Sequence, residues 1–168
     1  NNTTLPAANR LAMVEFHRKV SEITRVMQGT ESYAETLQRR VSSVLQALNS
    51  TPGADTALVR RARTAQLQLD EILNVEFNRN TGKPSDEENP PAPVPLNSRL
   101  GKLTWISWMT TGDPTGSQKE AYAILESEFP PVYDQVKNLG ETIVPQLEES
   151  LEKMGGPVTP GRLPEWKK

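Results

Sequence analysis

Apolar side chains recur along most of this chain at alternating steps of three and four residues, the pattern of an amphipathic helix with one buried face. The spacing predicts five helices and leaves two regions between and after them without the pattern. The helices are expected over residues 5–28, 31–48, 55–78, 98–109 and 117–154; the other regions are a proline-rich segment over 79–97 and a tail over 155–168.

The boundaries between the first three helices follow from local sequence signals. Gly29 is expected to end the first helix, and Thr30 is a plausible N-cap for the second, with Glu31 placed to complement the positive end of its dipole. Residues 49–55 are rich in turn-forming residues and form a short connection, which predicts an antiparallel hairpin. The apolar face of the second helix is expected to be Tyr33, Leu37, Val41, Val44 and Leu48.

The proline-rich segment cannot be helical, because proline fixes φ and removes a hydrogen-bond donor. An extended path at about 3.1 Å per residue would carry residues 84–95 over roughly 37 Å, close to the length of a long helix. We therefore interpret residues 79–97 as a crossover that lets the next helix start at the same end as the third one. A disordered linker between two helical hairpins is the alternative.

The last predicted helix contains Pro130, Pro131 and Pro145, each of which should cost about 3 kcal/mol inside a helix. The three-four spacing nevertheless continues through all three prolines, which predicts one kinked helix over 117–154. The alternative is a break into two helices near Pro130. Two capping boxes compete for its start, Thr115 with Gln118 and Ser117 with Glu120.

These elements predict an all-α fold: an antiparallel bundle of long amphipathic helices, similar to a four-helix bundle, in a single domain over residues 1–168. A chain of this length can bury a sizeable core without disulfides or metals. The tail over 155–168 is expected to be extended, with Trp166 as its anchor on the bundle. The chain starts at Asn1 without an initiator Met, and we expect it to be a fragment of a longer protein.

Composition removes several function classes. The chain has no Cys and one His, which excludes thiol catalysis, Cys-ligated metals and His-rich metal sites. A formal net charge of −2 provides no strong field toward nucleic acid or an anionic membrane surface. No apolar run approaches the ~20 residues of a membrane-spanning helix. We therefore expect no metal, no cofactor, no nucleic-acid partner and no membrane span.

The titratable clusters give no catalytic site. His17 lies beside the apolar face of the first helix, and we interpret it as a boundary residue and not as a catalytic base. Glu148, Glu149 and Glu152 cluster on the last helix, where like charges one turn apart are typical of a solvated face. The basic cluster at residues 60–63 is also interpreted as a solvated helix face. No catalytic residue is predicted.

Two tryptophans are the strongest candidates for binding. Trp105 and Trp108 stand three residues apart on a predicted helix, so both rings lie on one helix surface. An exposed pair would form an apolar patch that binds a sugar or a partner protein. The competing interpretation, which we favour at this stage, is that the two rings fill the core or the end of the bundle. Arg162 and Trp166 in the tail complete the candidate binding residues.

The order of features in the second half of the chain resembles a known family. These features are the segment 97–103, Asp113-Pro114-Thr115 with Gln118, the stretch 147–154, and the segment 156–166. Residues 97–166 resemble the C-terminal helical region of large secreted bacterial proteins with a sortilin-like β-propeller of BNR/Asp-box type, often labelled glycosyl hydrolases or sialidase-like. The resemblance implies an extracytoplasmic location (periplasmic, cell surface or secreted) and a propeller N-terminal to the helical module.

No Asp-box repeat occurs in this chain, so the hydrolase label does not transfer to it. The sequence therefore predicts a non-catalytic structural or interaction module, whose partner is the propeller portion of its parent chain or another protein. A carbohydrate- or protein-binding module that uses the tryptophan surface is one alternative. A second is a part of a BNR-repeat glycosyl hydrolase with its catalytic residues elsewhere, and a third is an enzyme that uses the acidic last helix.

Overall fold

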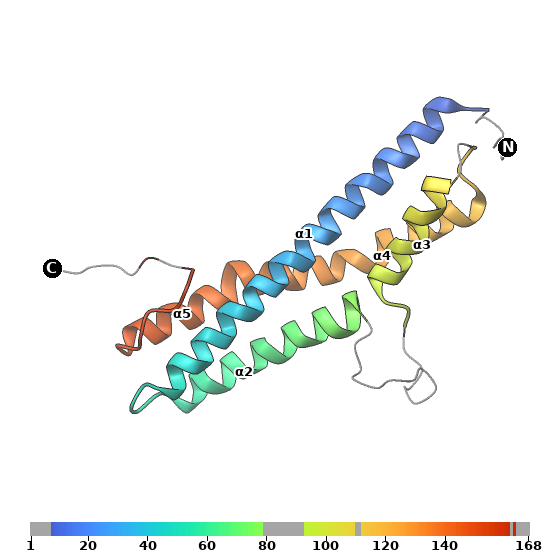
Figure 1. Cartoon of the computed structure of the whole chain (residues 1–168). Coiled ribbons are helices and arrows are strands. Elements are labelled where there is room, and N and C mark those ends of the chain that lie inside the picture. Colours follow the sequence, from blue (N-terminus) through green and yellow to red (C-terminus); the bar gives the residue numbers. More distant parts are fainter. Residues whose placement is uncertain (1–7, 79–92, 110–111, 162, 164–168) are drawn as a thin grey trace. The chain divides into compact units, whose positions relative to one another are not determined.

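The computed structural model describes residues 8–78, 93–109, 112–161 and 163, and in these residues the chain is helical with no β-strand (Figure 1). The all-α, bundle-like fold predicted from the apolar spacing is confirmed. The elements are α1 (Arg10–Asn49), α2 (Thr56–Glu71), the π-helical turn η1 (Ile72–Phe77), α3 (Leu96–Met109), α4 (Gly116–Asn138), the π-helical turn η3 (Leu139–Ile143) and α5 (Val144–Lys153).

The chain divides into two compact units. Unit 1 comprises Asn1–Thr30 and Asn74–Tyr133, and unit 2 comprises Glu31–Leu73 and Asp134–Lys168. Helices α1 and α4 each contribute residues to both units, so no unit is a continuous stretch of sequence. Each unit contains its own set of buried apolar side chains.

Unit 2 is built on the C-terminal half of α1, α2, and the helical stretch through η3 and α5. The Asp55 side chain accepts a hydrogen bond from the backbone N–H of Ala57 and caps α2. The short turn between α1 and α2 makes these two helices antiparallel (Figure 1). In contrast, α1 runs parallel to the helical stretch through η3 and α5. Two contacts show this, since they follow in the same order along both segments: Tyr33 lies against Gly140, and further on Arg40 binds Glu148.

Unit 1 repeats this arrangement with the N-terminal half of α1, α3 and the first part of α4. The backbone N–H groups of Ala8 and Asn9 donate to the Asp113 carboxylate at 3.1 and 3.2 Å. About two helical turns further along α1, the ring of Phe16 packs edge to face against the ring of Tyr122 on α4. These contacts make α1 and α4 parallel neighbours, while α3 runs antiparallel to α4.

The predicted crossover is wrong. Residues 79–92 lie outside the described residues, but the two sides of the segment are hydrogen-bonded: the Asn97 amide donates to the Asn78 side-chain oxygen at 3.0 Å. The chain therefore returns to the place it left instead of travelling the length of a helix. The extended length of a proline-rich segment is only its maximum reach, and closing a longer loop adds little entropy cost. Burial of Phe77 and Leu96 in unit 1 stabilises this return.

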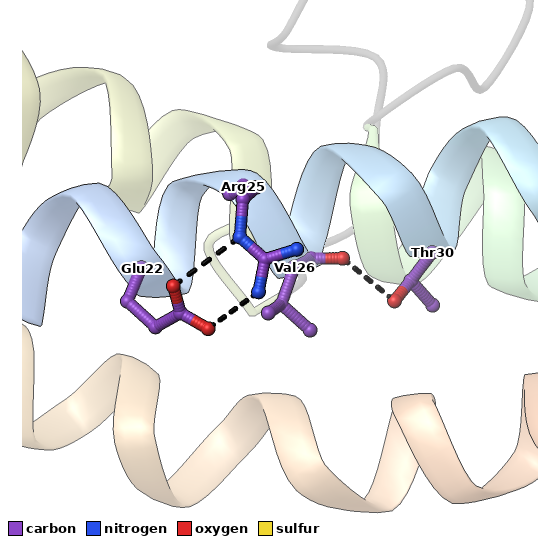
Figure 2. A network of polar contacts seen from close by, with 4 residues as sticks. All are labelled: Glu22, Arg25, Val26 and Thr30. Atoms are coloured by element: carbon purple, nitrogen blue, oxygen red, sulfur yellow. Dashed lines mark hydrogen bonds and ion pairs between the residues drawn. The ribbon is translucent and has the colours of Figure 1, made fainter.

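The predicted helix end at Gly29 is also wrong, because α1, which is 40 residues long, continues through Gly29 to Asn49. Thr30 does not act as an N-cap. Its hydroxyl donates to the carbonyl oxygen of Val26 at 2.8 Å, which is the bond of a threonine inside a helix (Figure 2). One glycine costs a helix only about 1 kcal/mol, and burial of Met27 and Ala34 on either side outweighs that cost.

Replacing Gly29 by alanine should therefore stabilise the protein. Gly29 is exposed, its φ is not positive, and a Cβ there would meet nothing within 4 Å. We expect Gly29→Ala to raise the free energy of unfolding by about 0.5–1 kcal/mol, measured by chemical denaturation. The matched control is Gly53→Ala, which has equally open surroundings but a φ of +72° and should destabilise. A loss of stability in Gly29→Ala would contradict a continuous α1.

The start of α4 uses the first of the two competing capping boxes. The Thr115 hydroxyl accepts a hydrogen bond from the Gln118 N–H at 3.3 Å, and the Gln118 side chain accepts one from the Thr115 N–H at 2.8 Å. From Gly116 to Lys153 the chain is helical throughout, with Pro130 and Pro131 inside α4. The helix therefore passes through Pro130 and Pro131 as predicted, and the alternative, a break near Pro130, does not occur.

The π-helical turn η3 explains how the helical path passes Pro145. The N–H of Val144 donates to the Leu139 carbonyl, five residues back, and the wider turn places Pro145 at the start of α5, where its missing N–H costs nothing. Gly140 in this turn lets the Tyr33 ring approach the backbone closely, and a Cβ there would overlap the ring unless Tyr33 moved. Tyr33 itself is 41% exposed and is not part of the buried face predicted for it; Ala34 is buried instead.

Candidate functional site

The predicted binding residues divide into one that is exposed and three whose side chains are not described. Trp105 on α3 is 68% exposed, which contradicts the expectation that it fills the core. Trp108 lies on the same helix, but its side chain is outside the described part of the structure. Arg162 and Trp166 also fall outside the described residues. Of the four predicted binding residues, the described part of the structure therefore places the side chain of Trp105 alone.

Helix α3 exposes Trp105 because its apolar positions point elsewhere. Leu100 and Leu103 are 6% and 1% exposed, and Trp105 is rotated by about 200° from Leu103 around the helix axis. The Thr104 hydroxyl is engaged inside the helix, where it donates to the Leu100 carbonyl at 2.9 Å. A large ring on the outer side of an amphipathic helix does not contribute to the apolar core between the helices.

A groove of about 610 Å³ lies between α1 and α3 in unit 1. All of its lining residues except Val20 have polar side chains, and they include the single histidine; the residues are His17, Val20, Ser21, Thr24, Arg25, Gln28 and Thr104. His17 is half-buried next to Phe16, at the boundary position expected for it. No carboxylate lines this groove and no hydrogen bond joins His17 to Ser21 within the described residues, so the groove lacks the oriented base and nucleophile of a hydrolase.

The acidic cluster on the last helix is not the uniformly solvated face that was predicted. Glu148 is 3% exposed, and its carboxylate accepts two hydrogen bonds from Arg40 of α1, at 2.9 and 2.7 Å. This hydrogen bonding raises the pKa of the Arg40 guanidinium, because the two bonds to the Glu148 carboxylate stabilise its charged form. Sequence spacing within one helix could not reveal this, because the partner stands 108 residues away.

The neighbouring glutamate behaves as expected for a surface residue. Lys153 pairs with Glu149 at 2.6 Å one turn along α5, and the hydrogen bond from Lys153 lowers the pKa of the Glu149 carboxyl. Both side chains are more than half exposed. Glu148 is thus a buried structural carboxylate and Glu149 belongs to a solvated ion pair, so these two glutamates differ in environment and do not form a shared site.

Two further grooves, not predicted from the sequence, lie between α1 and α4 in unit 1. One has a volume of about 580 Å³ and extends from Asn9 to Glu126; the other has a volume of about 420 Å³ and reaches Phe129. They share Lys19 and Tyr122. The Tyr122 ring packs on Phe16 with centroids 6.0 Å apart, and burial raises the pKa of its hydroxyl. Only knowledge of which helices are neighbours identifies these grooves.

A surface ion pair separates the α1–α3 groove from the smaller α1–α4 groove. Arg25 lines the former and Glu22 the latter, and the guanidinium donates to both carboxylate oxygens, at 3.2 and 2.6 Å (Figure 2). The hydrogen bonds from Arg25 lower the pKa of Glu22. The Glu22 charge is therefore balanced within α1.

Within the described residues, no three His, Asp or Glu side chains gather to form a metal site. The described helices also include none that is long and apolar enough to cross a membrane. Comparisons of the chain with family models, with curated proteins and with solved structures give no match.

Proposed function

We propose that this chain is a non-catalytic helical interaction module that binds another protein through the Trp105 surface of α3. The observation that carries the proposal is the 68% exposure of Trp105. Tryptophan is enriched among the residues that dominate protein interfaces, because its large ring loses a great deal of hydrated surface on binding. The lack of an oriented nucleophile and base in the described grooves agrees with a binding role.

The proposed partner is the β-propeller portion of a longer secreted polypeptide, with this chain as its helical C-terminal module. The support is the resemblance of residues 97–166 to the helical region of sortilin-like, Asp-box propeller proteins. The location would be extracytoplasmic. A hydrolase activity, where present, would belong to the propeller.

The test is binding in trans between the purified chain and the propeller portion made as a separate protein. For this test the chain is labelled with 5-fluorotryptophan, which gives one ¹⁹F signal for each of its three tryptophans. Single Trp→Phe substitutions assign these signals. We expect the Trp105 signal to shift on binding, and Trp105→Ala to weaken the affinity about tenfold. The matched control is Leu67→Ala on α2, which removes an equally exposed apolar side chain.

Three outcomes would overturn the proposal: no binding, equal affinity of Trp105→Ala and the unaltered chain, or equal weakening by Leu67→Ala. Hydrolysis of glycosides by the purified chain, abolished by substitution of His17 or Glu149, would refute its non-catalytic character.

Carbohydrate binding is a second candidate, favoured by the hydrogen-bonding side chains along the α1–α3 groove. Hydroxyl, amide and imidazole groups from Ser21, Thr24, Gln28 and His17 can bind sugar hydroxyls. Titration with oligosaccharides should then perturb amide signals along residues 17–28, and Gln28→Ala should reduce the affinity. An unchanged spectrum at saturating sugar would exclude this candidate.

A further inference from the structure

The exposed side of α2 in unit 2 carries three arginines that the proposed function does not use. Arg60, Arg61 and Arg63 are exposed, as expected of a solvated helix face. Within the described residues, the side chains of Arg60 and Arg63 form no ion pair and no hydrogen bond, and Arg61 donates to the uncharged amide of Gln146 at 3.1 Å. No carboxylate is therefore paired with any of the three guanidinium groups.

The surroundings of these arginines along the chain are poor in negative charge. Residues 41–69 are the part of the α1–α2 hairpin nearest its turn, and they contain three arginines and one carboxylate, Asp55, which gives a net charge of 3 − 1 = +2. The part of α1 in this range has no charged residue. The other acidic residues of α2, Asp70 and Glu71, lie at its far end, about 10 Å or more along the helix axis from Arg63.

The neighbouring helix α5 does not cancel this charge. It meets α2 at the hydrogen bond between Gln146 and Arg61. Its glutamates Glu148 and Glu149 are each paired with a cation, so their charges are already balanced. Glu152 is six residues beyond Gln146, which places it about 120° around α5 from the side chain that meets α2. The exposed side of α2 therefore keeps a net positive charge.

An apolar side chain lies on the same side of α2. Leu67 is 68% exposed, four residues after Arg63 and seven after Arg60, so the three side chains fall within about 60° of the helix circumference. We call Arg60, Arg63 and Leu67 the α2 basic face. The buried side chains of α2 lie on the opposite side of the helix, where they pack into unit 2; they are Leu58, Ala62, Ala65 and Leu69.

We propose that the α2 basic face binds an acidic helix of a partner protein. Carboxylates of that helix would pair with Arg60 and Arg63, and an apolar side chain would cover Leu67. A guanidinium can donate two parallel hydrogen bonds to one carboxylate, which makes arginine a strong partner for Asp and Glu. The spacing of the face, three and four residues, is also the spacing at which side chains of two packed helices interdigitate.

Nucleic acid and an anionic membrane fit this face less well. Helix α2 has no aromatic side chain that could stack on a base, and the chain has a net charge of −2. Leu67 is the one large apolar side chain of α2 that is exposed, whereas a helix that lies in a membrane surface needs a broad apolar side. A protein helix can use one apolar contact flanked by two ion pairs.

The probe is a fluorescein-labelled helical peptide of 16 residues, the length of α2, with Glu and Leu along one side in steps of three and four. Its binding is followed by fluorescence anisotropy at low salt. Two matched peptides replace all Glu by Gln or all Leu by Ser. We expect the acidic peptide to bind and both matched peptides to bind about tenfold or more weakly, because the face offers charge and apolar contact together. Affinity should decrease as salt is added.

The decisive variant is Arg60→Glu/Arg63→Glu, which should weaken binding of the acidic peptide at least about tenfold, because two attractions become repulsions. Its control, Arg18→Glu/Lys119→Glu, makes the same change in net charge at exposed cations of unit 1 and should leave the affinity nearly unchanged. None of the four side chains forms a hydrogen bond within the described residues, and glutamate is a good helix former, so both variants should fold. Helical circular dichroism verifies this. Leu67→Ser, which leaves every charge in place, should weaken binding about fivefold.

The proposal is overturned if the Gln peptide binds as tightly as the acidic one, if the control weakens binding as much as Arg60→Glu/Arg63→Glu, or if no peptide binds. Tighter binding of a DNA duplex or of phosphatidylserine vesicles through the same arginines would also overturn it and would assign the face to nucleic acid or to a membrane surface. The inference goes beyond the proposed function and does not rest on it: Trp105→Ala should leave peptide affinity unchanged, and Arg60→Glu/Arg63→Glu should leave propeller binding unchanged.

Discussion

Arg40→Ala is expected to lower the free energy of unfolding by about 3 kcal/mol, because it leaves the Glu148 carboxylate buried without its counter-charge. The Glu148 side chain is 4% exposed, whereas Arg40 is 22% exposed, so the penalty arises mainly from the stranded carboxylate. Chemical denaturation followed by helical circular dichroism measures the loss. Arg40→Lys should recover only part of it, since an ammonium cannot donate in the two-pronged geometry of the guanidinium.

The matched control is Arg25→Ala, which removes the same kind of two-pronged Arg–Glu pair from an exposed position. The side chains of Arg25 and Glu22 are 72% and 61% exposed, so water solvates Glu22 once its partner is gone. We expect Arg25→Ala to leave the unfolding free energy almost unchanged. Equal losses in the two variants would show that burial does not distinguish the two pairs and would contradict the structural role of Glu148.

Phe77→Ala is expected to destabilise unit 1 by about 3–5 kcal/mol, the cost of removing a fully buried aromatic ring and leaving a cavity. Phe77 is 0% exposed and is the last residue of the π-helical turn η1. The loss is measured by chemical denaturation and localised by faster hydrogen exchange of amides in α3 and α4.

Val75→Ala in the same turn serves as the control. Val75 is 53% exposed, and its truncation should change stability by no more than about 0.5 kcal/mol. If Phe77→Ala is as mild as Val75→Ala, the assignment of Phe77 to the core of unit 1 is wrong. If only amides of α1 after Thr30 respond, the assignment of Phe77 to unit 1 is wrong.

The two proposed surfaces and the grooves of unit 1 differ in what the sequence says about them. A pair of tryptophans on a predicted helix is visible in the sequence as a candidate, and only exposure had to be decided. The arginines at residues 60–63 are equally visible, but Gln146, the neighbour of Arg61 from α5, stands 85 positions away. The grooves between α1 and α4 are likewise assembled from residues about 100 positions apart in the chain, such as Lys19 and Lys119. No spacing rule connects such residues, because spacing reports neighbours on one helix only.

Local signals predicted most of the helical boundaries that depend on a few adjacent residues. The turn at residues 49–55, the helix start that follows it and the Thr115–Gln118 capping box all occur in the structure. Gly29 was misinterpreted because a glycine followed by a threonine is also a common helix end. Burial on both sides of the glycine decided the outcome, and burial depends on the other helices.

By itself, the sequence determined that this chain is all-α, where most of its helices lie and which faces of them are apolar. These properties follow from interactions between residues three or four positions apart, which the sequence contains directly. Only the tertiary structure decided that α1 continues past Gly29, that residues 78 and 97 meet, that Glu148 is buried against Arg40, and that Trp105 is exposed. Each of these depends on which helices become neighbours, and many arrangements of amphipathic helices bury the same faces equally well.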